Sequence, residues 1–478
     1  MNVAARNVTS GFTVLLLICA AAAGYFHQWL WLAAPIVVAV AWYLLQYPHL
    51  ILYALAATIP WSVEYNLTSA LGTDLPDEQL MWLGAGASLL LLAYRWRSFA
   101  FQKMHPLLWM LLLQLAWTFS TVLLSTHPLL SLKYLIAKSW YLLAFVVLPL
   151  FVWKDVAVLK RAVVILVSSM MLFVCWALYR HQQYGFSFEN VNDALAPFYR
   201  NHVNYSALLV FMIPLLLLFF QRVGSLPMKF IMLLFTVIAM AAVYLSYARG
   251  AWLALLVAGV SYFLIKKQWL VKAFVLSLAA VLIGIGVLAY NNTYLRFAPR
   301  FHTTVFHTDF NEHLKATYQF EDMSTIERYY RWIAGVRMAG DSWQMGFGPN
   351  TFYEHYKGYT IPAFKTWVSK NEERSTVHNY FLFLLIEQGV AGLVLFLVLV
   401  GSMFWYLQKL YRVSPDAKTR QNVQAITAIL TMICVVNFLS DMIETDKVGS
   451  IFYSCIAVII ILCKKQKNSN QLPAEDAH

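Results

Sequence analysis

The sequence predicts an all-α polytopic membrane protein with about twelve to fourteen transmembrane helices, and three observations lead to that prediction. Hydrophobic residues make up 60% of the 478 residues, and charged residues only 12%, about half the charged share of a soluble protein. The apolar residues also fall in long runs, and a membrane helix takes up about 20 of them. No soluble domain of this length buries so much apolar surface, so the composition excludes a cytosolic enzyme, a disordered chain and a disulfide-rich secreted module.

Fourteen apolar segments are candidate spans. The first follows Arg6, and we interpret it as a membrane helix rather than a signal peptide because no clear cleavage site precedes a soluble domain. The segments are residues 11–26, 29–46, 49–63, 79–95, 105–123, 131–152, 160–180, 203–221, 228–247, 250–265, 269–290, 377–407, 422–440 and 447–463. They predict eleven helices within 1–290, a large periplasmic loop at 291–376 with short helices, three helices within 377–463 and a cytoplasmic tail at 464–478.

The net charge of +12 agrees with a topology in which both termini are cytoplasmic. With fourteen spans, 19 of the 35 Lys and Arg residues, but only four of the 23 acidic residues, fall on the cytoplasmic segments. Lysine and arginine favour that side of a membrane protein, so the positive charge indicates orientation rather than nucleic-acid binding. The five cysteines lie in or at the end of apolar runs without a CxxC pair, and we expect them to be buried and unpaired.

The large loop contains one predicted helix. Ser324 and Glu327 have the spacing of a capping box, which predicts a helix over residues 325–339. Arg328 and Arg331 share one side of that helix, away from the side that carries its apolar and tyrosine residues. We expect the helix to lie at the outer membrane surface and to present both arginines at the level of lipid phosphates.

Two residues at the outer boundary are candidates for chemistry. Arg249 lies at a tight hairpin between two apolar segments, and its five-donor guanidinium suits a phosphate or diphosphate. His378 lies where the large loop enters the next helix, and a neutral imidazole there can take a proton from a hydroxyl group. On position alone, each has an alternative role: Arg249 as an interfacial arginine beside aromatic residues, and His378 as a histidine bonded to loop backbone.

Three further charged residues have less specific surroundings. Lys138 and Arg200 lie near outer ends of spans, where they either reach a phosphate or extend toward the lipid headgroups. Glu387 is the one acid within the assigned segments and follows His378 by nine residues, which places it about 13 Å deeper along a helix. Because it points away from His378, we expect Glu387 to bond the backbone of another helix or an ordered water.

Several other kinds of site are not indicated by the sequence. It contains no Walker A loop, no HExxH, no GxSxG and no cluster with metal-ligand spacing. Asp441, Glu444 and Asp446 are close together, but they occupy a short outer turn, where we expect a solvated loop rather than a metal site.

Three motifs follow one another along the predicted outer face. Residues 246–252 read S-x-x-R-G-x-W; residues 328–352 contain R-x-x-x-W and then G-x-G-x-x-x-F; residues 378–389 contain H-N-x-x-L and then E-x-G. This pattern resembles the O-antigen ligase / O-antigen polymerase superfamily of bacterial inner-membrane glycosyltransferases. The resemblance covers residues 246–389, while the flanking helices match only as helices and the fourteen spans exceed the twelve common in family ligases.

The resemblance implies a donor glycan on a polyprenyl (undecaprenyl) diphosphate, transferred at the periplasmic face with inversion. It implies catalytic roles for His378, Arg249 and Arg328, diphosphate binding by Arg200 and Arg331, and supporting roles for Asn379 and Glu387. Lys138 is added to the predicted diphosphate-binding residues from its position alone. His378 is expected to orient or deprotonate the acceptor hydroxyl. No metal or other cofactor is expected, because the arginines take the place of a cation.

The function that the resemblance favours is ligation of a lipid-linked polysaccharide to a lipid acceptor such as lipid A–core. Polymerisation of repeat units uses the same donor and leaving group and is the first alternative; transfer to protein hydroxyls is another. A transporter or flippase for the same lipid belongs to a different class. Such proteins place charged residues or broken helices at the membrane midplane, whereas most of the candidates here gather at one outer face. The expected partners are the lipid-linked donor, the acceptor and the bilayer, with no nucleic acid.

Overall fold

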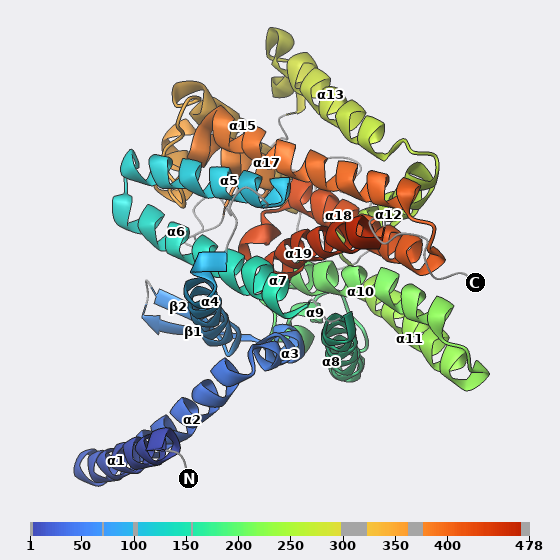
Figure 1. The fold of residues 1–478 in the computed structure, drawn as a ribbon. Coiled ribbons are helices and arrows are strands. Elements are labelled where there is room, and N and C mark those ends of the chain that lie inside the picture. The colour runs from blue at the N-terminus through green and yellow to red at the C-terminus, as the bar shows by residue number, and fades with distance from the viewer. Residues whose placement is uncertain are drawn as a thin grey trace.

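The computed structural model describes residues 3–68, 71–98, 104–153, 156–297, 323–361 and 376–469. The predicted fold class is confirmed: the described chain is a bundle of helices with one small β-hairpin (Figure 1). Ten of the described helices are long and apolar enough to cross a membrane, or up to eleven if one bent pair forms a single span.

The first part of the chain forms eight helices and the hairpin. Helices α3, α5 and α6 each begin at a proline, whose fixed φ suits a first helical turn and whose missing N–H is not needed there. The helices are α1 (Val3–Phe26), α2 (Ala33–Gln46), α3 (Pro48–Thr58), α4 (Asp77–Tyr94), α5 (Pro106–Leu123), α6 (Pro128–Leu142), α7 (Leu148–Val152) and α8 (Val156–Gln183). A π-helical turn, Leu143–Val147, joins α6 to α7.

Strands β1 (Val63–Thr68) and β2 (Leu71–Leu75) form the hairpin, which is antiparallel and pairs Glu64 with Asp74. It occupies the region that the sequence indicated only as an outer loop between the third and fourth spans.

The second part of the chain contains the predicted motifs. Its helices are α9 (Val191–Leu195), α10 (His202–Arg222), α11 (Leu226–Leu245), α12 (Arg249–Lys266), α13 (Leu270–Ala289), α15 (Met323–Asp341), α16 (Phe352–Tyr356), α17 (Tyr380–Val413), α18 (Ala417–Leu439) and α19 (Asp446–Ser469). The helix predicted over residues 325–339 is α15. The side chain of Ser324 lies outside the described residues, so its capping bond stays a prediction.

Each of the fourteen predicted segments contains a helix, but fewer qualify as separate spans. Helices α2 and α3 are bent by 116° relative to each other and pass the length and composition test only together. Helix α4 has 18 residues but opens with Asp77, Glu78 and Gln79, which lowers its apolar content. The prediction of twelve to fourteen spans therefore exceeds the ten or eleven found among the described residues.

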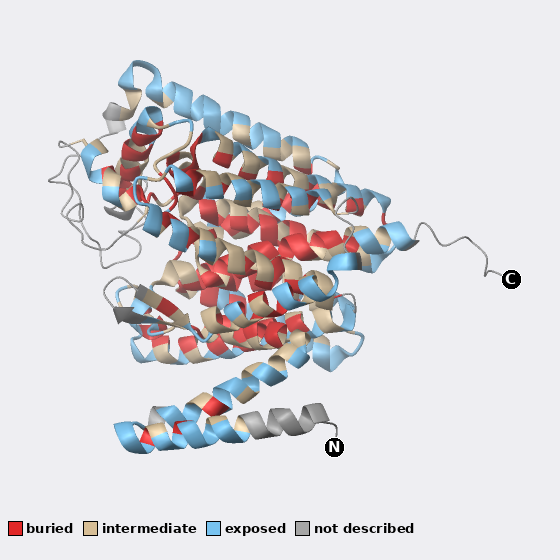
Figure 2. Cartoon of the chain, turned by 60° about the vertical axis from the view of Figure 1, so that its left-hand side comes forward, coloured by how far each residue is buried: buried red, intermediate tan, exposed pale blue. Residues whose placement is uncertain are grey.

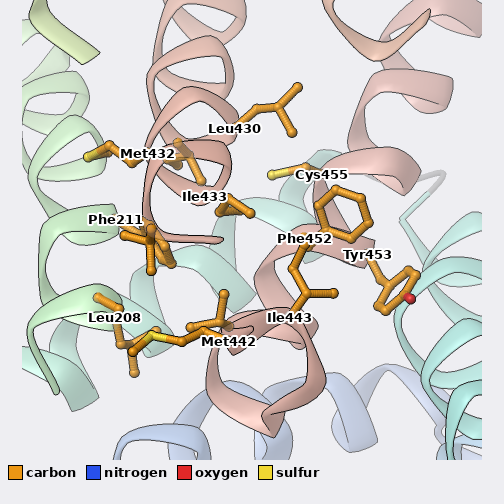
Figure 3. Close-up of a cluster of buried hydrophobic side chains, with 14 of the residues drawn as sticks. Leu208, Phe211, Leu430, Met432, Ile433, Met442, Ile443, Phe452, Tyr453 and Cys455 are labelled. Atoms are coloured by element: carbon orange, nitrogen blue, oxygen red, sulfur yellow. The ribbon is translucent and has the colours of Figure 1, made fainter. Parts of the chain in front are cut away.

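The buried residues lie mainly in the middle of the bundle (Figure 2). Figure 3 shows a cluster of them, where Leu208 and Phe211 of α10 face Ile433 of α18 and Phe452 of α19 approaches from the other side. By contrast, Leu270 is the one residue of α13 that is buried, and Figure 1 shows this helix at the edge of the bundle. The buried core thus includes residues of α10, α18 and α19.

The expectation of buried cysteines holds only in part. Cys19 and Cys455 are buried and Cys434 and Cys463 are half-buried, but Cys175 is exposed on α8. An apolar run predicts burial in protein or in lipid equally well, because hydrocarbon accepts such side chains without protein contacts.

Candidate functional site

The three motif segments meet at the end of α18, residues Phe438–Ser440. The backbone N–H of Tyr380 donates to the carbonyl of Ser440 at 3.0 Å. On α12, a Cβ added to Gly250 would lie 3.2 Å from a methyl group of Leu439. On α15, the ring of Trp332 lies edge-on to that of Phe438, with 5.8 Å between centroids. These contacts bring the starts of α12 and α17 and the middle of α15 to one place.

Asn379 connects the start of α17 to the end of α18. Its side-chain oxygen accepts the N–H of Leu382 at 2.9 Å as an N-cap, and its amide donates to the carbonyl of Phe438 at 3.0 Å. A cap that also bonds a second helix fixes the residue before it, which is His378. The H-N pair of the motif thus has a structural basis.

His378 lies directly against Arg331. The Nε2 atom of His378 is 3.3 Å from Nη1 of Arg331, which also donates to the carbonyl of Thr376 at 3.0 Å. An arginine can only donate, so Nε2 must be the acceptor and the ring proton resides on Nδ1. Burial, followed by the charges of Arg328 and Arg331, lowers the pKa of His378 from 6.5 to about 3. His378 is therefore a neutral imidazole over the physiological pH range.

The orientation of α15 corrects the sequence prediction. Arg331 is 7% exposed and faces inward, with its Nε 3.6 Å from the Oε2 of Glu327 one turn earlier. The cause is Gly335, where an added Cβ would lie 2.8 Å from Ile386, so α15 packs too closely on α17 for the arginine side to face lipid. Arg328 is half-buried and near enough to His378 for its charge to act on the imidazole.

Arg249 is the first residue of α12, at a hairpin that the surrounding motif residues hold closed. Ser246 Oγ donates to the carbonyl of Val243 at 2.7 Å, and Trp252 Nε1 donates to the same carbonyl at 3.1 Å. The last carbonyls of a helix lack intrahelical partners, so these two side chains complete the end of α11. The S-x-x-R-G-x-W spacing thereby places a half-buried Arg249 beside the end of α18.

Glu387 bonds backbone, as expected, but the backbone belongs to the loop between α13 and α17. Its side chain is fully buried and accepts the N–H groups of Asn350 at 2.6 Å and Phe352 at 3.1 Å. These donors lie at the start of α16, where a carboxylate is favourable. Glu387 therefore ties the segment after α15 to α17.

The glycines of two motifs make this tie possible. Gly389 has a φ of +68°, and an added Cβ would lie 2.2 Å from the carbonyl oxygen of Gln344; one added to Gly346 would lie 2.3 Å from the backbone of Glu387. Because neither glycine carries a side chain, the two backbones approach closely, and the N–H of Gly348 donates to the carbonyl of Glu387 at 3.0 Å. The G-x-G and E-x-G motifs are thus two halves of one backbone contact.

Lys138 and Arg200 each have a carboxylate partner, in place of the open approach to a phosphate that the sequence suggested. Lys138 Nζ lies 2.8 Å from Glu444 Oε1, and these side chains are only 13% and 22% exposed. Arg200 pairs with Glu64 of β1, and its side chain is 71% exposed. Neither pairing could be read from the sequence, because the partners lie 306 and 136 residues apart.

Asp441 lies beside the candidate site, and the expectation of a solvated turn there is wrong. Met442 and Ile443 beside it are buried. Burial raises the pKa of Asp441 to about 6, against a hydrogen bond from Thr376 and the charge of Arg331 that act to lower it. The signal in the sequence that could have indicated it is the group of three acids, Asp441, Glu444 and Asp446, in one short turn. Within the described residues no group of three or more His, Cys, Asp or Glu side chains could hold a metal ion.

Comparisons with known proteins match the part of the chain that contains these motif segments. Residues 234–397 match a family model described as O-Antigen ligase, and this range contains all three motif segments. An O-antigen ligase of Salmonella typhimurium (strain LT2) is 26% identical over 231 residues, which cover 45% of this chain and 49% of the relative. The chain thus spans about half the length of the curated relative it matches. The comparisons confirm that the chain resembles the O-antigen ligase superfamily, with the resemblance carried by residues 234–397.

Proposed function

We propose that this protein is a glycosyltransferase that moves a glycan from a polyprenyl diphosphate to an acceptor hydroxyl at the periplasmic face of a bacterial inner membrane. The observation that carries the proposal is that the residues following Arg249, Arg331 and the His378-Asn379 pair all contact the end of α18. Arg331 and His378 also contact each other there. The matched O-antigen ligase family favours ligation to a lipid acceptor such as lipid A–core. Polymerisation of repeat units remains the first alternative, because it needs the same donor and leaving group.

The arginines supply what the leaving group requires. When the bond between the anomeric carbon and the diphosphate breaks, negative charge grows on the departing oxygen. Guanidinium groups match phosphate oxygens with paired N–H donors, and fixed donors aimed at developing charge are among the strongest catalytic devices. Arg328 and Arg331 lie one turn apart on α15 and Arg249 approaches from α12, so a diphosphate between them meets cations from two sides.

His378 is placed to act on the acceptor. The acceptor oxygen attacks the anomeric carbon directly, the carbon–oxygen bond to the diphosphate breaks, and the configuration inverts. His378 is neutral and can orient the hydroxyl through a ring nitrogen while the bond forms. Asp441, in the turn beside it, balances the charge of Arg331.

The test is transfer by the purified protein in liposomes, in the presence of a chelator. The substrates are a polyprenyl-diphosphate oligosaccharide and a lipid A–core acceptor. We expect glycan on lipid A–core from the wild type, and loss of transfer in Arg249→Ala and His378→Ala. Arg337→Ala is the matched control, because Arg337 is an exposed arginine on the same α15 and donates to the carbonyl of Tyr359, away from the end of α18.

The products separate the alternatives. A ladder of longer lipid-linked glycans, also lost in both variants, means a polymerase with the same site. Transfer that both variants retain contradicts this site, and absence of any transfer by the wild type favours a transporter of the same lipid.

A further inference from the structure

Arg331 and His378 form a contact in which one group blocks the other. The Nε2 lone pair of His378, which is the atom able to take a proton, already accepts an N–H of Arg331. The blocking guanidinium is itself held from two sides, by the carbonyl of Thr376 and by Glu327. While this contact is made, His378 is therefore unable to act as a base through Nε2.

The block is weak enough to be released. The separation of 3.3 Å between Nη1 and Nε2 is longer than the 3.0 Å from the same Nη1 to the Thr376 carbonyl, and typical N–H donors lie at about 2.9–3.0 Å. A phosphate oxygen is a better acceptor for a guanidinium than an imidazole is, because the bond is charge-assisted. A diphosphate at the arginine face thus competes with His378 for Arg331.

We propose that the donor lipid switches His378 from blocked to basic: a diphosphate bound by Arg328 and Arg331 draws the guanidinium away from Nε2 and cancels the positive charge around the ring. This inference rests on the proposed function and adds an order to it, in which the donor binds before the acceptor is activated. Water that reaches the site before the donor then meets an inactive histidine.

The proton balance of the step is complete. The acceptor hydroxyl gives its proton to Nε2 of His378 as its oxygen bonds the anomeric carbon, and the electron pair of the broken bond leaves on the diphosphate. His378 then carries protons on both ring nitrogens, and it loses one to solvent when the diphosphate departs with its charge. Arg331 returns to Nε2, which restores the blocked state.

The charged groups that act on the pKa of His378 are both cationic. Arg328 and Arg331 face it from α15, and their charges lower its pKa. Asp441 lies in the turn after α18 and Arg249 at the start of α12, both at the same end of α18. A diphosphate brings two or more negative charges among these groups. It therefore changes the electrostatic potential at His378 by more than any one of the groups does. At about 6 Å and an effective dielectric constant of about 20, one unit charge shifts a pKa by about two units.

The experiment is a pH titration of ring-labelled histidine by NMR, with the full chain in lipid nanodiscs. His378→Gln assigns the signal, and the probe lipids are undecaprenyl diphosphate and, as a control, undecaprenyl monophosphate; phosphorus NMR reports binding. We expect no titration of His378 between pH 5 and 8 without lipid, and a pKa raised by about two units or more with the diphosphate. We expect Arg331→Gln to raise the pKa of His378 without any lipid.

Three results overturn the inference, and they differ in what else they contradict. If the diphosphate binds and the titration of His378 does not change, the switch is wrong while the proposed function stands. If the diphosphate does not bind at all, both fail. If the monophosphate shifts the pKa of His378 as much as the diphosphate does, the diphosphate has no specific role. The shift is then a general effect of anionic lipid.

Discussion

Removing only Lys138 from the ion pair with Glu444 should cost far more unfolding free energy than replacing both residues with uncharged ones. Lys138→Met leaves Glu444 as a largely buried charge, although Tyr134 still donates a hydrogen bond to it at 3.0 Å. Removing one partner of a buried pair costs about 3–5 kcal/mol of unfolding free energy, and we expect the lower end, about 3 kcal/mol, because the side chains keep 13% and 22% exposure. The Coulomb energy of about 4 kcal/mol for two charges at 4 Å and a dielectric constant of about 20 is consistent with that value.

The double variant Lys138→Met, Glu444→Gln tests the reasoning. The amide introduced by Glu444→Gln keeps an acceptor for Tyr134, and no charge is left unpaired, so we expect the double variant to lie within about 1 kcal/mol of the wild type. The assay is a double-mutant cycle on denaturant unfolding in detergent, with Lys133→Met, an exposed lysine on the same helix, as the control expected within about 0.5 kcal/mol. If the losses of unfolding free energy in the two single variants add up in the double variant, with a coupling energy below about 0.5 kcal/mol, the ion pair is refuted.

The same cycle decides what Lys138 does in the reaction. If its role is to hold the α18–α19 turn through Glu444, the double variant should regain the donor KM of the wild type. If Lys138 instead binds the diphosphate, the double variant should stay impaired, because the lysine is missing whatever stands at position 444. The second result would restore the role that the sequence suggested.

Three further predictions concern the outer loop and the turn. Glu387→Gln should lower the free energy of unfolding by about 2–3 kcal/mol and reduce transfer, because an amide N–H₂ then faces a backbone donor. The control Glu354→Gln, at an exposed position, should do neither. If the two variants behave alike, the contact of Glu387 with the loop backbone is not important. Gly348→Ala should cost about 3–5 kcal/mol, since its Cβ would lie 2.1 Å from Ser125 Oγ at a φ of +105°, whereas Gly340→Ala, with open space around it, should be neutral or slightly stabilising in thermal unfolding. Asp441 loses its charge as the pH falls through about 6, so transfer should decline below that pH in the wild type and stay level, at a reduced rate, in Asp441→Asn; a decline that survives the substitution places the titrating group elsewhere.

Local patterns allowed much of this fold to be predicted. Long apolar runs predicted a helix in every one of the fourteen segments, because a chain in hydrocarbon must satisfy its backbone internally. The spacing of Ser324 and Glu327 predicted α15 to within two residues at each end. The number of separate spans was less accurate, because the bend between α2 and α3 depends on how α3 packs on α4 and α8 and not on its own apolar content.

What the sequence could not predict are contacts between distant residues. A helix face carrying arginines normally faces water or headgroups, and only the close approach at Gly335 turns Arg331 toward His378. Lys138 was expected near a phosphate because no sequence rule names Glu444 as its partner. For the same reason Asp441 was assigned to a solvated turn, although Thr376, some 65 residues earlier, covers it.

The most direct test of the central claim is the binding of undecaprenyl diphosphate in nanodiscs by the wild type, Arg249→Gln, Arg328→Gln and the double variant. If both arginines hold one diphosphate, each single change should weaken binding by about tenfold or more, and the two effects should not be additive, because the groups share a ligand. Undecaprenyl monophosphate should bind more weakly to the wild type and respond less to either change. Binding that Arg328→Gln weakens and Arg249→Gln leaves untouched would contradict a single site at the end of α18.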